Sequence, residues 1–127
     1  GLPAWYNKSW FAQSPPFSEL KPSNGYIAPP LDGVWATAPY LHNGSVPTIA
    51  ALLNSSERPT QWRKMSQEPD APYDLDALGW AYTTTPGEKK TYLFDTELPG
   101  YGNQGHYYGD ELTSKERQAV LEYLKTL

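Results

Sequence analysis

A very short list of side chains limits the metal and redox chemistry open to this chain. Its 127 residues contain two histidines, one methionine and no cysteine. Without cysteine, the chain cannot form disulfides, thiolate metal sites or a covalent link to haem. A self-contained zinc site built from histidine and cysteine is excluded for the same reason. His42, His106 and Met65 are therefore the side chains to consider as metal ligands.

Both histidines are predicted to lie in loops. His106 belongs to the glycine-rich run 102–109, where the backbone can approach a metal with little side-chain crowding. His42 directly precedes Asn43-Gly44, which is a strong turn signal. From the chemistry alone, a histidine held by hydrogen bonds within its own loop is the simpler interpretation of both positions.

Other catalytic and binding patterns do not fit the sequence. No serine lies in a G-x-S-x-G elbow. Asp70, Asp74 and Asp76 alternate as in a calcium loop, but no glycine turn or terminal glutamate follows at the required offset. The run 100–109 lacks the Lys-Ser/Thr of a phosphate-binding loop. A net charge of −4 without a basic cluster argues against nucleic acid as a partner, and no segment approaches the length of a membrane span.

The composition predicts a loop-rich chain held by aromatic packing. It includes 13 prolines and 10 glycines, together with 5 tryptophans and 10 tyrosines. An aromatic content of 14% argues against disorder. Because a loop-rich chain of this size buries limited surface alone, we expect more chain, a partner or a large cofactor to complete its core.

The first half of the sequence predicts little regular structure. Prolines interrupt residues 1–32, so we expect there only a short aromatic-rich helix or turn that packs onto the rest of the protein. After the turn at 43–44, a helix is predicted to begin at Ser45 or Val46, with Pro47 in its first turn. Three apolar residues have the spacing of its buried face: Ile49, Leu52 and Leu53.

The C-terminal helix is the clearest element that the sequence predicts. Thr113 and Glu116 form a capping-box pattern at the start of residues 113–127. The apolar stripe expected to dock on a core is Val120, Leu121, Leu124 and Leu127. Upstream, we expect one helical turn over 74–78, and 91–94 is the best strand candidate of its region. The fold class predicted is mainly α with extensive loops.

A long ordered run connects these observations with a known family. Residues 25–48, GYIAPPLDGVWATAPYLHNGSVPT, resemble the C-terminal region of dihaem cytochrome c peroxidase-like proteins, and in particular the subgroup that contains the rubber oxygenase. Four later pieces fit the same group: Arg58-Pro59, Tyr73-Asp74, residues 102–109 and residues 112–127. The resemblance implies that 25–127 is the downstream half of a cytochrome c peroxidase-like haem domain, preceded by a Pro/aromatic-rich docking segment, 1–24.

The resemblance also implies that part of the haem domain lies elsewhere. In that family, haem is attached through Cys-x-x-Cys-His, whose histidine is the proximal iron ligand. This sequence lacks the motif, so a partner chain or an upstream segment is expected to carry the haem c. Because the chain begins at Gly1 and not at Met, we expect a product of processing or cloning, either a separate subunit or a cleaved fragment. The implied location is the bacterial periplasm or the cell exterior, with a redox partner protein.

Individual roles follow from the resemblance. His106 is expected to be the distal axial ligand to haem iron, with Met65 as the alternative. His42 corresponds to the histidine of the family's Pro-Tyr-x-His-x-Gly motif and is expected beside the haem, at a propionate or between two haems. The residues expected to pack on the haem or pair with its propionates are Trp35, Tyr40, Tyr107, Tyr108, Arg58 and Arg63.

Three functional hypotheses follow. The first is electron transfer or peroxidase/oxygenase-type chemistry; if His106 closes the only haem that it touches, peroxide or oxygen chemistry needs a second, open haem. In the second hypothesis this same haem is catalytic, and His42 or a tyrosine assists O–O cleavage. The third is a haem-free secreted module whose aromatic residues stack on sugar or peptide. The aromatic content and three Asn-x-Ser/Thr sites allow that module, but it explains neither histidine motif.

Overall fold

The computed structural model describes residues 1–22, 25, 28–66, 72–85 and 93–127. The helices are α1 (Leu2–Lys8), α2 (Trp10–Gln13), α3 (Ile49–Leu52) and α4 (Ser114–Leu124), with 3-10 turns η1 (Val34–Ala36) and η2 (Ser55–Glu57). The strands are β1 (Gln61–Lys64), β2 (Tyr73–Asp74), β3 (Gly79–Trp80), β4 (Tyr82–Thr83) and β5 (Phe94–Asp95). Among these residues, no helix has the length and apolar character needed to cross a bilayer.

The strands form two small antiparallel sheets. One has the order β4-β1-β5, and the other is the hairpin β2-β3. In the first, Trp62 of β1 faces Phe94 of β5, and their rings stack with centroids 5.4 Å apart. Lys64 faces Tyr82 of β4, and its ammonium lies 4.5 Å from the centre of the Trp80 ring. Cross-strand aromatic pairs of this kind stabilise short strands.

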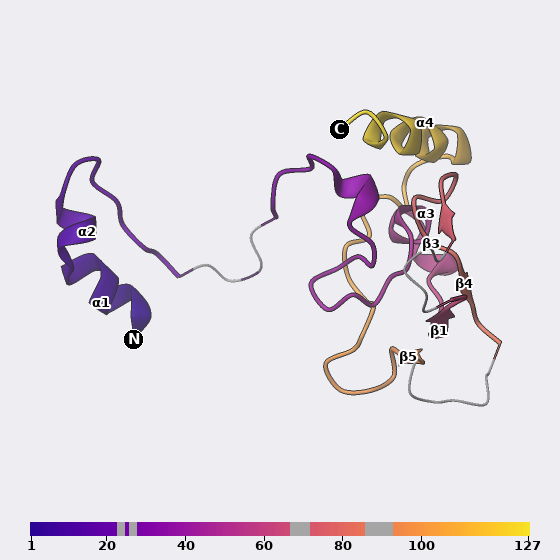
Figure 1. Cartoon of the computed structure of the whole chain (residues 1–127), viewed down its shortest axis with the longest axis horizontal. Coiled ribbons are helices and arrows are strands. Elements are labelled where there is room, and N and C mark those ends of the chain that lie inside the picture. Colours follow the sequence, from indigo (N-terminus) through magenta and orange to yellow (C-terminus); the bar gives the residue numbers. More distant parts are fainter. Residues whose placement is uncertain (23–24, 26–27, 67–71, 86–92) are drawn as a thin grey trace.

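The predicted mainly α fold is wrong. α4 is the only described helix longer than seven residues, and antiparallel strands organise the middle of the chain (Figure 1). The physical reason is that the aromatic residues, which favour pleated surfaces, pair across strands. Phe94 of the predicted strand 91–94 begins β5, whereas residues 91 and 92 lie outside the described residues. The predicted helical turn at 74–78 is the turn of the β2-β3 hairpin.

The helix α3 begins later than predicted, because the residues before it pair with another segment of the chain. Val46 exchanges backbone hydrogen bonds with Tyr40, so it cannot begin the helix as predicted. The helix begins at Ile49 instead, and the Thr48 hydroxyl caps it by accepting from the amide of Ala51. The turn that precedes β3 supplies carbonyl partners for the free amides of Ile49 and Ala50.

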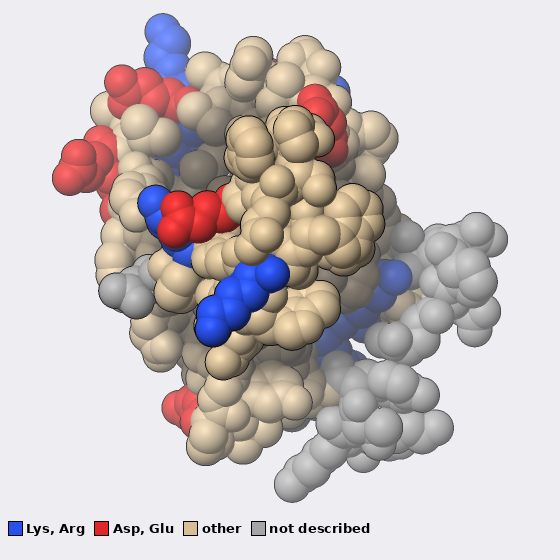
Figure 2. All heavy atoms as spheres, turned by 90° about the vertical axis from the view of Figure 1, so that its left-hand side faces the viewer, with Lys and Arg blue, Asp and Glu red and all other residues tan. Residues whose placement is uncertain are grey.

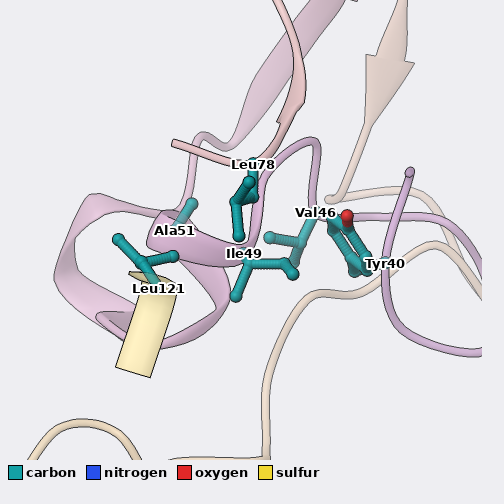
Figure 3. Close-up of a cluster of buried hydrophobic side chains, with 6 residues drawn as sticks. All are labelled: Tyr40, Val46, Ile49, Ala51, Leu78 and Leu121. Atoms are coloured by element: carbon teal, nitrogen blue, oxygen red, sulfur yellow. The ribbon is translucent and has the colours of Figure 1, made fainter. Parts of the chain in front are cut away.

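Among the described residues, six buried side chains make up the hydrophobic core cluster: Tyr40, Val46, Ile49, Ala51, Leu78 and Leu121. They come from the Tyr40–Val46 turn, α3, the β2-β3 turn and α4, and Ile49 lies in the middle of the group (Figure 3). Of the predicted buried face of the α3 helix, Ile49 is buried, whereas Leu52 and Leu53 are only half-buried. The core is small, as the loop-rich composition leads one to expect.

The predicted C-terminal helix and its capping box are confirmed. Thr113 accepts a hydrogen bond from the Glu116 amide at 3.3 Å, and Glu116 accepts from the Thr113 amide at 2.8 Å. These bonds to Thr113 lower the pKa of the Glu116 carboxyl. Leu121 joins the core, and the carbonyl of Leu127 accepts from the Gly33 amide at 3.1 Å. The helix is therefore attached to the core by its apolar face and to the start of η1 at its end.

The N-terminal helices lie apart from the rest of the described chain (Figure 1). The short helical structure predicted for this segment is confirmed, and its packing onto the rest of the protein stays a prediction. Hydrogen bonds between the Tyr6 and Ser18 hydroxyls and between Asn7 and Leu20 close the segment on itself. Its exposed apolar residues include Leu2, Trp5, Trp10, Phe11 and Phe17, which are 53% to 77% exposed. Seen from the side on which these helices project, the surface is mostly uncharged (Figure 2).

Gly79 marks the closest approach of two backbone segments in the core. A Cβ at this position would lie 2.2 Å from the Pro47 carbonyl oxygen and 2.6 Å from the Thr48 Cα. Because both atoms belong to the backbone, the Gly79→Ala variant is expected to lose about 1–3 kcal/mol of unfolding free energy. Chemical denaturation measures this loss. In the control Gly102→Ala, the new methyl group meets only the flexible Gln104 side chain, so an equal loss there would contradict the account.

Candidate functional site

One guanidinium group holds the loop that carries His106. Arg58 Nη1 donates to the carbonyl oxygens of Asn103 and Gly105, both at 2.7 Å. Arg58 Nη2 donates to the carbonyl oxygen of His106 itself at 2.9 Å. The Asn103 side chain adds a bond at 3.1 Å to the Pro59 carbonyl. The backbone around His106 is therefore fastened to the segment just after η2, 44 to 48 residues earlier in the chain.

The same side chain also binds the end of α3. Nη2 donates to the Leu52 carbonyl at 2.9 Å, and Nε donates to the Ala51 carbonyl at 3.3 Å. These are among the carbonyls that a helix leaves unpaired at its C-terminus. Arg58 thus makes five hydrogen bonds, one for each of its N–H groups. Its guanidinium also lies 5.7 Å from the centre of the Tyr107 ring.

The five bonds give Arg58 a structural role within the chain, and its predicted pairing with a haem propionate stays a prediction. Each of its N–H groups donates to a backbone carbonyl. Its function in the structure is to join the end of α3 to the His106 loop. Arg63, the other predicted partner of a propionate, lies in β1, and its Nε is buried without a hydrogen-bond partner among the described residues.

Asn43 joins the two histidine-bearing loops to each other. Its Nδ2 donates to the Gly102 carbonyl at 2.8 Å and to the Gly100 carbonyl at 3.3 Å. Its Oδ1 accepts from the Ser45 amide at 3.1 Å, which closes the turn after His42. The two motifs that the sequence singled out are therefore neighbours in the fold, although nearly 60 residues separate these partners. The His42 side chain is exposed.

His106 has an uncommon backbone conformation. Its φ is +53°, in the left-handed region, and Gly105 before it has φ +87°. A residue with a side chain in this region costs about 1–3 kcal/mol and persists only where its surroundings impose it. Here the Arg58 bonds to the carbonyls of Gly105 and His106 supply that constraint. Such strain is typical of functional sites.

The surroundings of His106 are open and aromatic. Its side chain is exposed, and together with Tyr107, Tyr108 and Glu111 it lines a shallow hollow. The Tyr108 ring meets the imidazole edge-on, with centroids 6.4 Å apart. Tyr107 and Tyr108 are both exposed, so this surface has apolar rings available for a further group.

Asp110 fastens the far end of the loop. Its carboxylate accepts from the Ser55 amide at 2.8 Å and from the Ser55 hydroxyl at 2.6 Å. These bonds lower the pKa of the Asp110 carboxyl. Beside it, a Cβ on Gly109 would lie 2.4 Å from the Leu53 carbonyl oxygen, so the two backbones touch. The loop with His106 is thus attached on both sides of the histidine.

The other predicted site residues lie in different places. Tyr40 is buried in the core, where its hydroxyl donates to the carbonyls of Val34 and Trp35 at 3.0 and 3.3 Å, and burial raises its pKa far above the usual range. These bonds give Tyr40 a structural role, and its predicted contact with haem stays a prediction. Trp35 in η1 is partly exposed. Met65 directly follows β1 and is also exposed, so it remains available as a ligand.

The set of donors fits haem iron better than a bare metal ion. Within the described ranges, no three His, Cys, Asp or Glu side chains are grouped so that they could hold a metal. Haem iron is different, because the porphyrin fills the equatorial positions and one side chain is needed on each face. A single exposed imidazole on a fixed loop meets that requirement.

Residues 25–63 match the sequence model of the RoxA-like, cytochrome c-like family. The matched segment includes His42, the turn closed by Asn43, α3 and Arg58, whereas His106 lies outside it. The match relates the chain to cytochrome c-like proteins, and with them to haem. Only one of the two histidine motifs that the sequence singled out falls inside the match.

Two relatives in the bacterium Sinorhizobium fredii (strain NBRC 101917 / NGR234) extend the similarity over most of the chain. Uncharacterized protein y4iJ is 45% identical over 112 residues, and the match covers 80% of this chain and 18% of that protein. Uncharacterized protein y4iM is 35% identical over 120 residues, and the match covers 80% of this chain and 27% of that protein. The chain therefore spans about a fifth to a quarter of the length of these relatives.

Because residue 106 has a left-handed backbone conformation, the glycine variant at this position is predicted to be more stable than the alanine variant, which reverses the usual order. The His106→Gly variant is expected to be about 1 kcal/mol more stable than His106→Ala, because glycine adopts positive φ without strain. Urea denaturation of both variants measures the difference. At His42, whose φ is not positive, the order should be the usual one, with glycine about 0.4–1 kcal/mol less stable than alanine. The same order at both positions would show that residue 106 carries no strain.

Proposed function

We propose that this chain is a subunit or fragment of a multihaem c-type cytochrome. It corresponds to the C-terminal, downstream half of a dihaem peroxidase-like domain, and it supplies a haem-pocket wall and the distal axial ligand His106. The single observation that carries the proposal is an exposed imidazole on a loop fixed by Arg58 in a left-handed conformation. The cytochrome c-like match over residues 25–63 supports it.

The haem c would be attached through the Cys-x-x-Cys-His motif of a partner chain or of another segment of the same protein. When bound, it would supply one-electron redox chemistry, used for electron transfer or for peroxidase- or oxygenase-type reactions. This chain's own task is to present a neutral imidazole at His106. The exposed rings of Tyr107 and Trp35 would pack against the cofactor, with His42 beside it. Met65, also exposed, is the alternative ligand.

Residues 1–24 act in this proposal as the segment that docks on the haem-bearing part. Two short helices present large apolar side chains that the described chain does not cover. Because cytochrome c-like domains are typically extracytoplasmic, the proposed location is the bacterial periplasm or the cell exterior, where a redox partner protein exchanges electrons with the assembly.

A haem-free secreted module that stacks its aromatic residues on sugar or peptide is the second candidate. The exposed rings of Trp5, Trp10 and Phe17 favour it. It gives no reason for the strained His106 or for the Arg58 bonds that hold its loop, so it ranks second. The absorption spectrum of the native assembly separates the candidates, because only the first has a Soret band.

The spectrum also tests the assignment of His106 as ligand. We expect the native ferric assembly to be low-spin, and the His106→Ala variant to become high-spin because an axial ligand is lost. His42→Ala, which removes the other exposed histidine, should remain low-spin. An unchanged spectrum in His106→Ala rejects this histidine as ligand, and a change in Met65→Ala instead would assign the iron to the thioether. A native assembly without a Soret band rejects the haem itself.

Limited proteolysis tests the docking of residues 1–24. In the native assembly, trypsin cleavage after Lys8 is expected to be slow, because the partner surface covers α1 and α2. The double variant Trp10→Ser/Phe17→Ser should expose Lys8 to rapid cleavage, as followed by mass spectrometry. Its control, Leu75→Ser/Tyr123→Ser, alters residues 64% and 62% exposed on other elements and should keep the protection. If trypsin cleaves after Lys8 as fast in the unaltered assembly as in the double variant, docking of residues 1–24 is contradicted.

A further inference from the structure

We propose that Arg58 is a positioning residue that fixes the direction of the His106 imidazole. This inference rests on the proposed function, in which His106 binds haem iron. Arg58 would act without touching iron or porphyrin, because its five N–H groups are already bonded to backbone carbonyls. The imidazole would reach the iron in the correct direction only while the Arg58 bonds to the loop are intact.

The loop has little structure of its own. Residues 102–106 belong to no helix, strand or hydrogen-bonded turn. Glycines at 100, 102 and 105 flank or interrupt the loop, so the free backbone could adopt many conformations. Three of the four carbonyls from Asn103 to His106 point to one guanidinium. The conformation of the loop therefore depends on a side chain outside it.

The other end of this connection reaches the core. Arg58 binds the carbonyls of Ala51 and Leu52 at the end of α3, and Ala51 is buried in the hydrophobic cluster with Ile49. A rigid planar group with donors on both sides thus connects packed residues to the loop. The flexible, strongly hydrated ammonium of a lysine cannot match five carbonyls arranged around a plane. For this reason, Arg58→Lys is expected to behave as a loss of function rather than as a conservative change.

Arg117 provides a matched control on the same segment. Its Nε donates to the Gly109 carbonyl and its Nη2 to the Asp110 carbonyl, both at 3.1 Å. It is an arginine bonded to backbone carbonyls close to His106 in sequence, but it makes no bond to residues 103–106. Arg117→Lys therefore removes similar interactions without releasing the histidine.

Cyanide titration of the ferric native assembly measures how firmly His106 holds the iron. For Arg58→Lys and Arg58→Gln, the cyanide concentration that displaces half of the axial ligand is expected to fall roughly 10- to 100-fold, as when an outer partner of a metal ligand is removed. Arg117→Lys should titrate like the unaltered protein. Melting curves, recorded in parallel, confirm that the titrated variants are folded, and only folded variants are compared.

The outcomes separate this inference from the proposed function. If His106→Ala changes the spectrum but the folded Arg58 variants titrate like the unaltered protein, the positioning role is wrong and the ligand assignment stands. If His106→Ala leaves the spectrum unchanged, both the assignment of His106 as ligand and the positioning role of Arg58 are wrong. An equal fall in the half-displacing cyanide concentration for Arg117→Lys also overturns the positioning role of Arg58. It would show that loss of any arginine bonded to this part of the backbone loosens the loop. A shift confined to the Arg58 variants supports the positioning role.

Discussion

The hydrogen bonds of one arginine determine how the candidate site is built. Arg58 takes the carbonyls that α3 leaves unpaired and those of the loop around His106, and it brings both to the same planar group. Without these bonds, the glycine-rich loop has no regular structure to hold it. These bonds hold the carbonyls on either side of the left-handed His106, while Asn43, Asn103 and Asp110 hold the loop at other points.

The rest of the fold fits a chain that is completed by something else. In the part of the chain that the structure describes, the core cluster contains six side chains and the strands are two to four residues long. Large aromatic residues on α1, α2 and the His106 loop remain exposed. A domain with so little buried surface is only weakly stable alone. A haem face and a docked neighbouring domain would each cover apolar surface that the chain now leaves open. These exposed apolar side chains would thus contribute both to binding of the cofactor and to association with the neighbouring domain.

Local signals in the sequence predicted local structure. The capping box at Thr113 and Glu116 and the turn at Asn43 depend on neighbouring residues, so they could be recognised without the fold. Strands of two residues have no measurable alternation, which is why the fold class was predicted wrongly. The bonds from Arg58 span up to 48 residues, and nothing local distinguishes an arginine that binds carbonyls from one that binds a propionate. The same holds for Tyr40, whose burial follows from packing against Val46 and not from its motif.

The central claim is that this chain closes a haem pocket whose haem is attached elsewhere. Native mass spectrometry of the purified assembly, followed by peptide mapping, tests it most directly. We expect haem mass on a Cys-x-x-Cys-His peptide, either in a chain that remains bound to residues 25–127 or in another segment of the same polypeptide. An intact assembly without haem mass, or haem attached to no such peptide, would contradict it.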